Sequence, residues 1–249
     1  MSLLYDYQKL FRPQVIKRPN FNNKLDFKNV GFLGVTSVIN ESWDYEDDFS
    51  TDKMTYAGSG FTYNASNDNQ DVTVPNTLGS PQSYVDMLAT TVSDTLWELR
   101  VLLDINSFTA NTVGTIKHNF IGLFSSTSDM TAGQDAMYIN YGSFNSAGNF
   151  HIGNTDGGAP NVNLGDILTT ALSVTEFYLA VLRQSATLQK VSISSTSNYT
   201  EDVETKTKAV ASTTQSLRYH QHSNRSGSVN GTISGIYDNV KFADAVNYL

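Results

Sequence analysis

The chain has 249 residues, enough for one sizeable domain or two small ones with a buried core. Charged residues make up only 16%, against roughly 25% in a typical globular protein, and Ser, Thr, Asn and Gly take their place, with 13 Tyr and 13 Phe to pack. This composition favours an all-β domain over a coiled coil. The absence of cysteine excludes disulfide scaffolds, thiolate zinc sites and thiol nucleophiles.

Charge is divided unevenly along the chain. Residues 1–30 carry six Lys and Arg against two Asp, a net +4, and the remaining residues carry a net −12. A basic arm on an acidic body suggests attachment and display. Because the arm has no dense basic run and is interrupted by Pro13 and Pro19, docking on an acidic partner protein or a neighbouring copy is favoured over nucleic-acid binding. A solvated, unstructured tail is the alternative.

The first residues have the spacing of a short amphipathic helix. Over residues 2–11 the apolar stripe consists of Leu3, Tyr7, Leu10 and Phe11, and so short a helix forms only against a partner surface. We therefore predict partner binding through this stripe and Arg12. The arm contains no hydrophobic core of a signal peptide, and no apolar run reaches the length of a membrane-spanning helix. Neither secretion through a leader nor membrane insertion is expected.

From Gly31 onward, short apolar runs alternate with turn residues. Trp97, Leu99, Val101 and Leu103, for example, share one face of a single predicted strand. Segment 164–172 is the one stretch of the body with the character of a helical turn. Ten or more short strands predict a sandwich or jelly roll, with candidates at 31–38, 60–64, 70–74, 97–105, 119–124, 135–141, 176–183, 188–194, 216–221 and 235–242.

Several of these segments, in this order, resemble the concanavalin A-like lectin/glucanase jelly roll, especially its laminin-G-like members. The resemblance covers residues 43–245 and rests on segments 47–50, 93–100, 120–125, 177–181 and 236–242. It implies two antiparallel sheets, one of them concave, with ligands on the concave face or the rim loops. Such domains occur on phage and archaeal-virus fibre and decoration proteins, often behind an anchoring arm. We therefore predict an arm at 1–40 and a jelly-roll domain at 41–249.

Alternating carboxylates at Asp44, Glu46 and Asp48 would share one face of a strand. Hydrolases of the family use Glu-x-Asp-x-Glu, because a nucleophile and a general acid must flank one glycosidic bond. Here the order is Asp-x-Glu-x-Asp, and the residues lie at the entrance of the domain instead of mid-sheet. Glycoside hydrolysis of the family-16 type is therefore the less favoured alternative, and the protein is predicted not to be an enzyme.

The resemblance also implies a structural calcium ion joining the first strand to the last. Asp48 and Asp238 are the ligands it suggests, since calcium prefers hard oxygen donors. The alternative is that Asp238 caps a turn or pairs with Lys241.

Sugar recognition needs aromatic faces beside planar polar groups. Two stretches supply both kinds of side chain, and the candidate carbohydrate-binding residues are Tyr141, Phe144, Asn145, His151, Tyr219, His220, His222 and Asn224. Ordinary surface histidines and core aromatics are the alternatives.

These observations predict a virion structural or display protein on the virion surface, made in the host cytoplasm. Its arm would bind other virion proteins through residues 1–30 and would also assemble a homo-oligomer, for which a trimer is the first expectation. Its lectin-like domain would bind host-surface glycans. A free-standing carbohydrate-binding module is the alternative.

Overall fold

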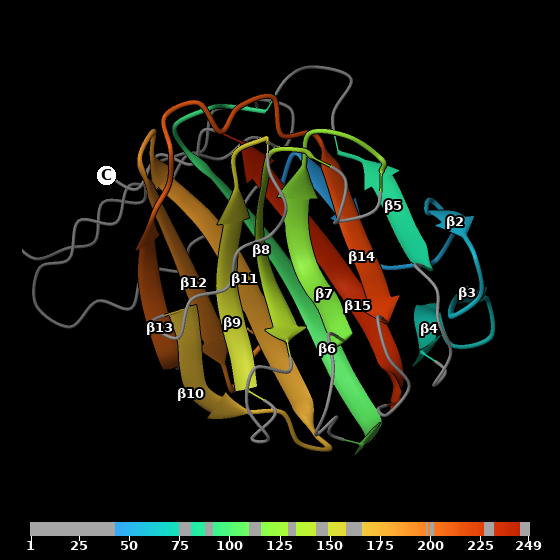
Figure 1. Ribbon diagram of the computed structural model, residues 1–249. Helices are drawn as coiled ribbons and strands as arrows, with labels where there is room; N and C mark the ends of the chain where they lie inside the picture. The colour runs from blue at the N-terminus through green and yellow to red at the C-terminus, as the bar shows by residue number, and fades with distance from the viewer. Residues whose placement is uncertain are drawn as a thin grey trace, which may run out of the picture. The chain divides into compact units, whose positions relative to one another are not determined.

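The computed structural model describes residues 43–74, 81–87, 92–109, 116–128, 133–142, 149–157, 166–197, 199, 202–226 and 232–244. Together they form two antiparallel sheets packed face to face (Figure 1), the jelly-roll sandwich expected from the sequence. The chain divides into a unit formed by Trp43–Tyr248 and a second unit formed by Met1–Ser42 with Leu249. The expected helix over residues 2–11 and the strand at 31–38 lie outside the described residues.

Eight strands form the first sheet, in the order β13-β12-β11-β6-β15-β4-β3, with β1 paired to β15. The two longest, β6 and β15, lie side by side at its centre and are antiparallel. The strands of this sheet are β1 (Tyr45–Asp47), β3 (Phe61–Asn64), β4 (Asn69–Val74), β6 (Trp97–Thr109), β11 (Glu176–Ser185), β12 (Leu188–Ser194), β13 (Asp202–Ala209) and β15 (Thr232–Asp244).

The second sheet has seven strands in the order β10-β9-β8-β7-β14-β5-β2, and Figure 1 views the molecule from its side. Its strands are β2 (Thr55–Ala57), β5 (Gln82–Asp86), β7 (Ile116–Phe124), β8 (Ala136–Gly142), β9 (Asn149–Thr155), β10 (Ile167–Ala171) and β14 (Tyr219–Ser226).

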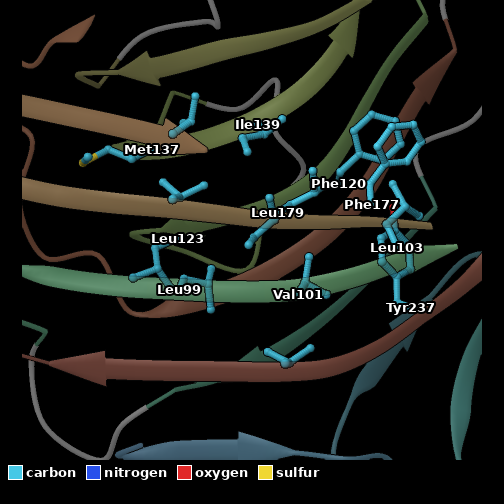
Figure 2. Packing of buried hydrophobic residues seen from close by; sticks show 14 of the residues in the cluster. Leu99, Val101, Leu103, Phe120, Leu123, Met137, Ile139, Phe177, Leu179 and Tyr237 are labelled. Atoms are coloured by element: carbon cyan, nitrogen blue, oxygen red, sulfur yellow. The ribbon is translucent and has the colours of Figure 1, made fainter. Parts of the chain in front are cut away.

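Apolar side chains of alternate strand positions fill the space between the sheets. Leu99, Val101 and Leu103 of β6 face the second sheet, because successive side chains of a strand point to opposite faces. Figure 2 shows them with side chains of β7, β8, β11 and β15, among them Phe120, Leu123, Met137, Ile139, Phe177, Leu179 and Tyr237. The apolar residues that alternate along the predicted strand at 97–105 are therefore core residues, as expected.

The helical turn expected within residues 164–172 is wrong, since Ile167–Ala171 is strand β10, at the edge of the second sheet. The edge strand of the other sheet, β13, lies across from it and supplies its polar partners. The Glu204 carboxylate accepts hydrogen bonds from the backbone N–H groups of Thr169 (2.8 Å) and Thr170 (2.7 Å). Lys206 Nζ donates to the Ile167 carbonyl at 2.7 Å. These tertiary contacts stabilise an extended conformation that local sequence does not specify.

Candidate functional site

A row of polar side chains crosses the outer face of the seven-stranded sheet. Strand register places His151 of β9 opposite Asn140 of β8, and Asn140 opposite Asn119 of β7. The row continues through Ser223 of β14 to Gln82 of β5. Met137, Ile139 and Tyr141 of β8 point into the core, so Asn140, which alternates with them, points to the outer face. Residues directly opposite each other on neighbouring strands share a face, and so the whole row does. In β7 the register shift between Asn119 and Ile121 turns Asn119 outward although Ile121 points inward.

The next row along the same strands runs through Tyr138 and Gln221. Tyr138 lies between Gly153 and Gly122 in the register, and its ring stacks on Phe124 with centroids 6.0 Å apart. A Cβ at Gly153 would lie 2.1 Å from the Tyr138 ring, so only glycine leaves room for this tyrosine. We call the residues of both rows, His151, Asn140, Asn119, Ser223, Gln82, Tyr138 and Gln221, the polar face.

The polar face is buried, and much of its hydrogen-bonding capacity is unused. All seven residues are less than 10% exposed. Buried polar atoms are normally paired, and each one left unpaired costs about 1–3 kcal/mol. The atoms without a partner are Asn119 Oδ1, Asn140 Oδ1 and Nδ2, His151 Nδ1 and Nε2, Tyr138 Oη, Gln221 Oε1, Ser223 Oγ and Gln82 Oε1. So many unpaired polar atoms in one place are unusual for a protein interior, which makes the polar face the candidate site.

The face carries no charge at neutral pH. Burial lowers the pKa of His151 to about 4, with a smaller opposing effect from Asp166, so its imidazole is neutral and offers one donor and one acceptor. Burial likewise raises the pKa of Tyr138, which keeps the phenol protonated. The other five residues are amides and a hydroxyl.

The sequence-predicted sugar residues fall in several places. His151 belongs to the polar face, and Tyr219 is half-buried at the beginning of β14, opposite Phe124 on the same face. Tyr141 is buried in the core between the sheets. Phe144 and Asn145 lie outside the described residues, and of Asn224 only the backbone position in β14, opposite His118, is described.

Two of the predicted sugar ligands, His220 and His222, point into the core and do not belong to the polar face. Both are fully buried, and the His222 ring packs on Tyr237 of the opposite sheet with centroids 3.7 Å apart. They point inward because they alternate along β14 with Gln221 and Ser223. The surface patch predicted around these histidines is therefore wrong, and the outward residues between them belong to the polar face.

The three carboxylates considered for glycoside hydrolysis lie on the eight-stranded sheet, away from the polar face. Asp44, Glu46 and Asp48 belong to β1 and its flanks, and β1 pairs with β15 of the eight-stranded sheet. Glu46 forms an ion pair with Lys241 at 2.7 Å, and Asp44 accepts a hydrogen bond from the Asp244 backbone at 2.8 Å. The row from His151 to Gln82 contains no carboxylate.

The residues predicted to hold calcium do not form a coordination shell. Asp48 is exposed and accepts a hydrogen bond from the Ser50 backbone, while Asp238 accepts one from the backbone of Asn239 at 2.6 Å. Burial, together with the nearby Asp48 and Asp47, raises the pKa of Asp238. Within the described ranges no group of three or more His, Asp or Glu side chains could hold a metal ion, so the residues present do not fit a calcium centre.

The predicted partner-binding residues Leu3, Tyr7, Leu10, Phe11 and Arg12 all lie outside the described residues. Among the residues that are described, no helix has the length and apolar character needed to cross a membrane.

No protein-family model matches the chain, and no curated protein matches it significantly in sequence. Solved structures show the fold. Lectin II from Ulex europaeus superposes with a TM-score of 0.55 at 10% identity, over 82% of this chain and all of that one. The CBM2 module of the evolved Dit of Lactobacillus casei BL23 phage J-1 gives 0.53 at 9%, over 83% and 97%. A β-1,3-1,4-glucanase from a mouse hindgut metagenome gives 0.52 at 8%, over 80% and 98%. The chain therefore has the concanavalin A-like jelly-roll fold that its sequence resembles.

Proposed function

We propose that this protein is a carbohydrate-binding domain that holds its ligand on the polar face. The observation that carries the proposal is the set of buried, unpaired polar atoms shared by His151, Asn140, Asn119 and their neighbours. Each sugar hydroxyl both donates and accepts a hydrogen bond, and so a saccharide can satisfy donors and acceptors that alternate across a sheet.

Binding without catalysis fits the chemistry of this face. Glycoside hydrolysis normally requires two carboxyl groups flanking the scissile bond, and the cross-strand row contains only amides, a hydroxyl and a neutral imidazole. Similar folds include lectins, a carbohydrate-binding module and a glucanase, so the fold is compatible with either role and the side chains favour binding.

The test is calorimetric titration of the full chain with a panel of soluble oligosaccharides, in calcium and in EDTA. Asn140→Ala removes two of the unpaired atoms, and we expect it to weaken binding about tenfold, as loss of one or two hydrogen bonds implies. The matched control is Thr205→Ala, an exposed change on β13 of the other sheet. Equal affinity in both variants would overturn the placement of the ligand, and absence of binding to the whole panel would overturn the function.

We further propose that the arm anchors this domain in a virion as a display protein on the particle surface. Support comes from the opposite charges of residues 1–30 and the rest of the chain, +4 against −12; unlike charges favour docking of an arm on an acidic neighbour. Measuring the solution mass of full-length protein beside residues 31–249 tests the anchoring step. An oligomer, a trimer by our expectation, that becomes monomeric on truncation supports it, whereas two equal masses contradict it.

A further inference from the structure

Three amides of the polar face are held in one orientation by backbone carbonyl groups. Asn119 Nδ2 donates to the carbonyl of Gln221. Gln221 Nε2 donates to the carbonyl of Ser126, and Gln82 Nε2 donates to that of Thr127 at 2.8 Å. A carbonyl oxygen can only accept, so the NH2 end of each amide must point toward it.

The oxygen ends of the same amides are consequently fixed as acceptors. Asn119 Oδ1, Gln221 Oε1 and Gln82 Oε1 are buried and have no partner. A flip of any of these amides would set two carbonyl oxygens against each other and lose a hydrogen bond, so the three cannot become donors to suit a different ligand. The hydroxyls of Ser223 and Tyr138, in contrast, rotate and can either donate or accept.

From this arrangement we infer that the ligand is an uncharged saccharide, recognised chiefly through its own hydroxyl donors; the inference rests on the proposed function. Three fixed oxygens demand three donors from the ligand. A carboxylate or sulfate would instead place negative charge against these oxygens, and the buried, uncharged polar face supplies no cation to compensate for its lost hydration. The acidic body of the chain, net −12, adds long-range repulsion of an anion. A cationic sugar would be attracted at long range, but its ammonium group would lose its hydration on a face that has no carboxylate to pair with it.

Cationic residues do occur two positions further along two of these strands. Lys117 of β7 lies opposite Arg225 of β14, beyond Asn119 and Ser223 in the register. Recognition of an acidic glycan through these two cations and recognition of a neutral one through the three fixed acceptors predict opposite ligand preferences, and the experiment below separates them.

The experiment varies the ligand and leaves the full-length protein unchanged, so folding does not affect its reading. Neutral hexasaccharides of glucose, mannose and galactose are compared with oligogalacturonate, a hyaluronan hexasaccharide and chitosan oligomers, and the tightest neutral binder is also tested after partial O-methylation. Methylation removes donors and keeps oxygen acceptors. We expect at least tenfold weaker binding of every charged ligand and of the methylated one.

The outcomes are distinct. Neutral ligands binding at least tenfold more tightly than charged and methylated ones would confirm the inference. Equal or tighter binding of an acidic ligand that is lost on Lys117→Ala or Arg225→Ala, or of chitosan, would overturn it while leaving carbohydrate binding in place. Retained binding of the methylated ligand would overturn recognition through hydroxyl donors. No binding of any saccharide would overturn the proposed function itself.

Discussion

The imidazole rings of His220 and His222 meet nearly at right angles inside the sandwich, with their planes 82° apart and their Nε2 atoms separated by 2.9 Å. His222 Nδ1 donates to the Phe120 carbonyl at 2.8 Å, which leaves its Nε2 as the acceptor for the Nε2–H of His220. His220 Nδ1 lies 3.1 Å from the carbonyl of Gly122. His220 Nδ1 can therefore take up a proton and donate it to the Gly122 carbonyl. A second proton would have to bind His222 Nε2, where its N–H group would point at the Nε2–H of His220.

Acid should destabilise the fold through these two histidines. Burial lowers the pKa of His220 from 6.5 to about 4, and burial and the neighbouring His220 hold the pKa of His222 well below 6.5. The unfolded chain thus binds protons below pH 6.5 that the folded chain does not, so stability is constant above that pH and falls as pH drops. Between pH 7 and pH 5 we expect a loss of about 2 kcal/mol per histidine in urea unfolding.

Proton NMR of the two imidazole rings provides the direct check, since each should remain neutral in the folded protein at pH 5. His151, whose pKa is also lowered to about 4, contributes in the same direction, so the unfolding series is repeated with His151→Gln to isolate the inner pair. Titration of His220 near pH 6.5 in the folded state would contradict the account.

Gly153 should not tolerate alanine while Tyr138 is present. Its added methyl group would lie 2.1 Å from the Tyr138 ring, and overpacking of this kind costs about 1–3 kcal/mol. In a Tyr138→Ala background the same change should cost much less, because the ring is gone. A double-mutant cycle on unfolding free energy measures the difference, and additive effects would mean that the two residues do not compete for space.

Replacing Glu204 by Gln should loosen the edge strands. The carboxylate accepts from the backbone N–H and the Oγ1 hydroxyl of Thr170 (both 2.7 Å) and from the Thr169 N–H. A hydrogen bond to a charged group contributes about 1.5–3 kcal/mol. Glutamine keeps one acceptor oxygen but loses the charge, so we expect the unfolding free energy to fall by roughly 1–2 kcal/mol. Amide exchange in β10 should become faster. Val203→Ala, at an exposed neighbouring position, is the control and should change neither.

The sequence predicts the core strands well and the candidate site poorly, for a physical reason. Leu99 and Val101 alternate with polar residues, and such alternation indicates a strand with one buried face. The β13 pattern Glu204-Thr205-Lys206 offers no apolar face, so its strand forms through pairing with β12. Asn119, Asn140 and His151 come from three separate strands, and only register brings them into one row. A polar strand position in isolation predicts solvent exposure, not a buried site.

Arg100 should be hard to replace even by lysine. Its guanidinium carbon lies 4.9 Å from the ring centroid of Trp43 and 4.5 Å from that of Tyr199, and Nε lies 2.6 Å from Glu98. A planar cation stacks between two rings in a way that an ammonium group does not, so Arg100→Lys should cost about 1–2 kcal/mol and shift the fluorescence of Trp43.

The matched control for Arg100 is Arg218→Lys. Arg218 forms a two-point ion pair with Asp86 where both side chains are about 40% exposed, and it lies over the single ring of Tyr219. Solvent screens such exposed contacts. Thermal unfolding of the two variants side by side should therefore show a larger drop in Tm for the first than for the second. Equal shifts would mean that the two rings of Trp43 and Tyr199 around the less exposed Arg100 stabilise it no more than the exposed contacts stabilise Arg218.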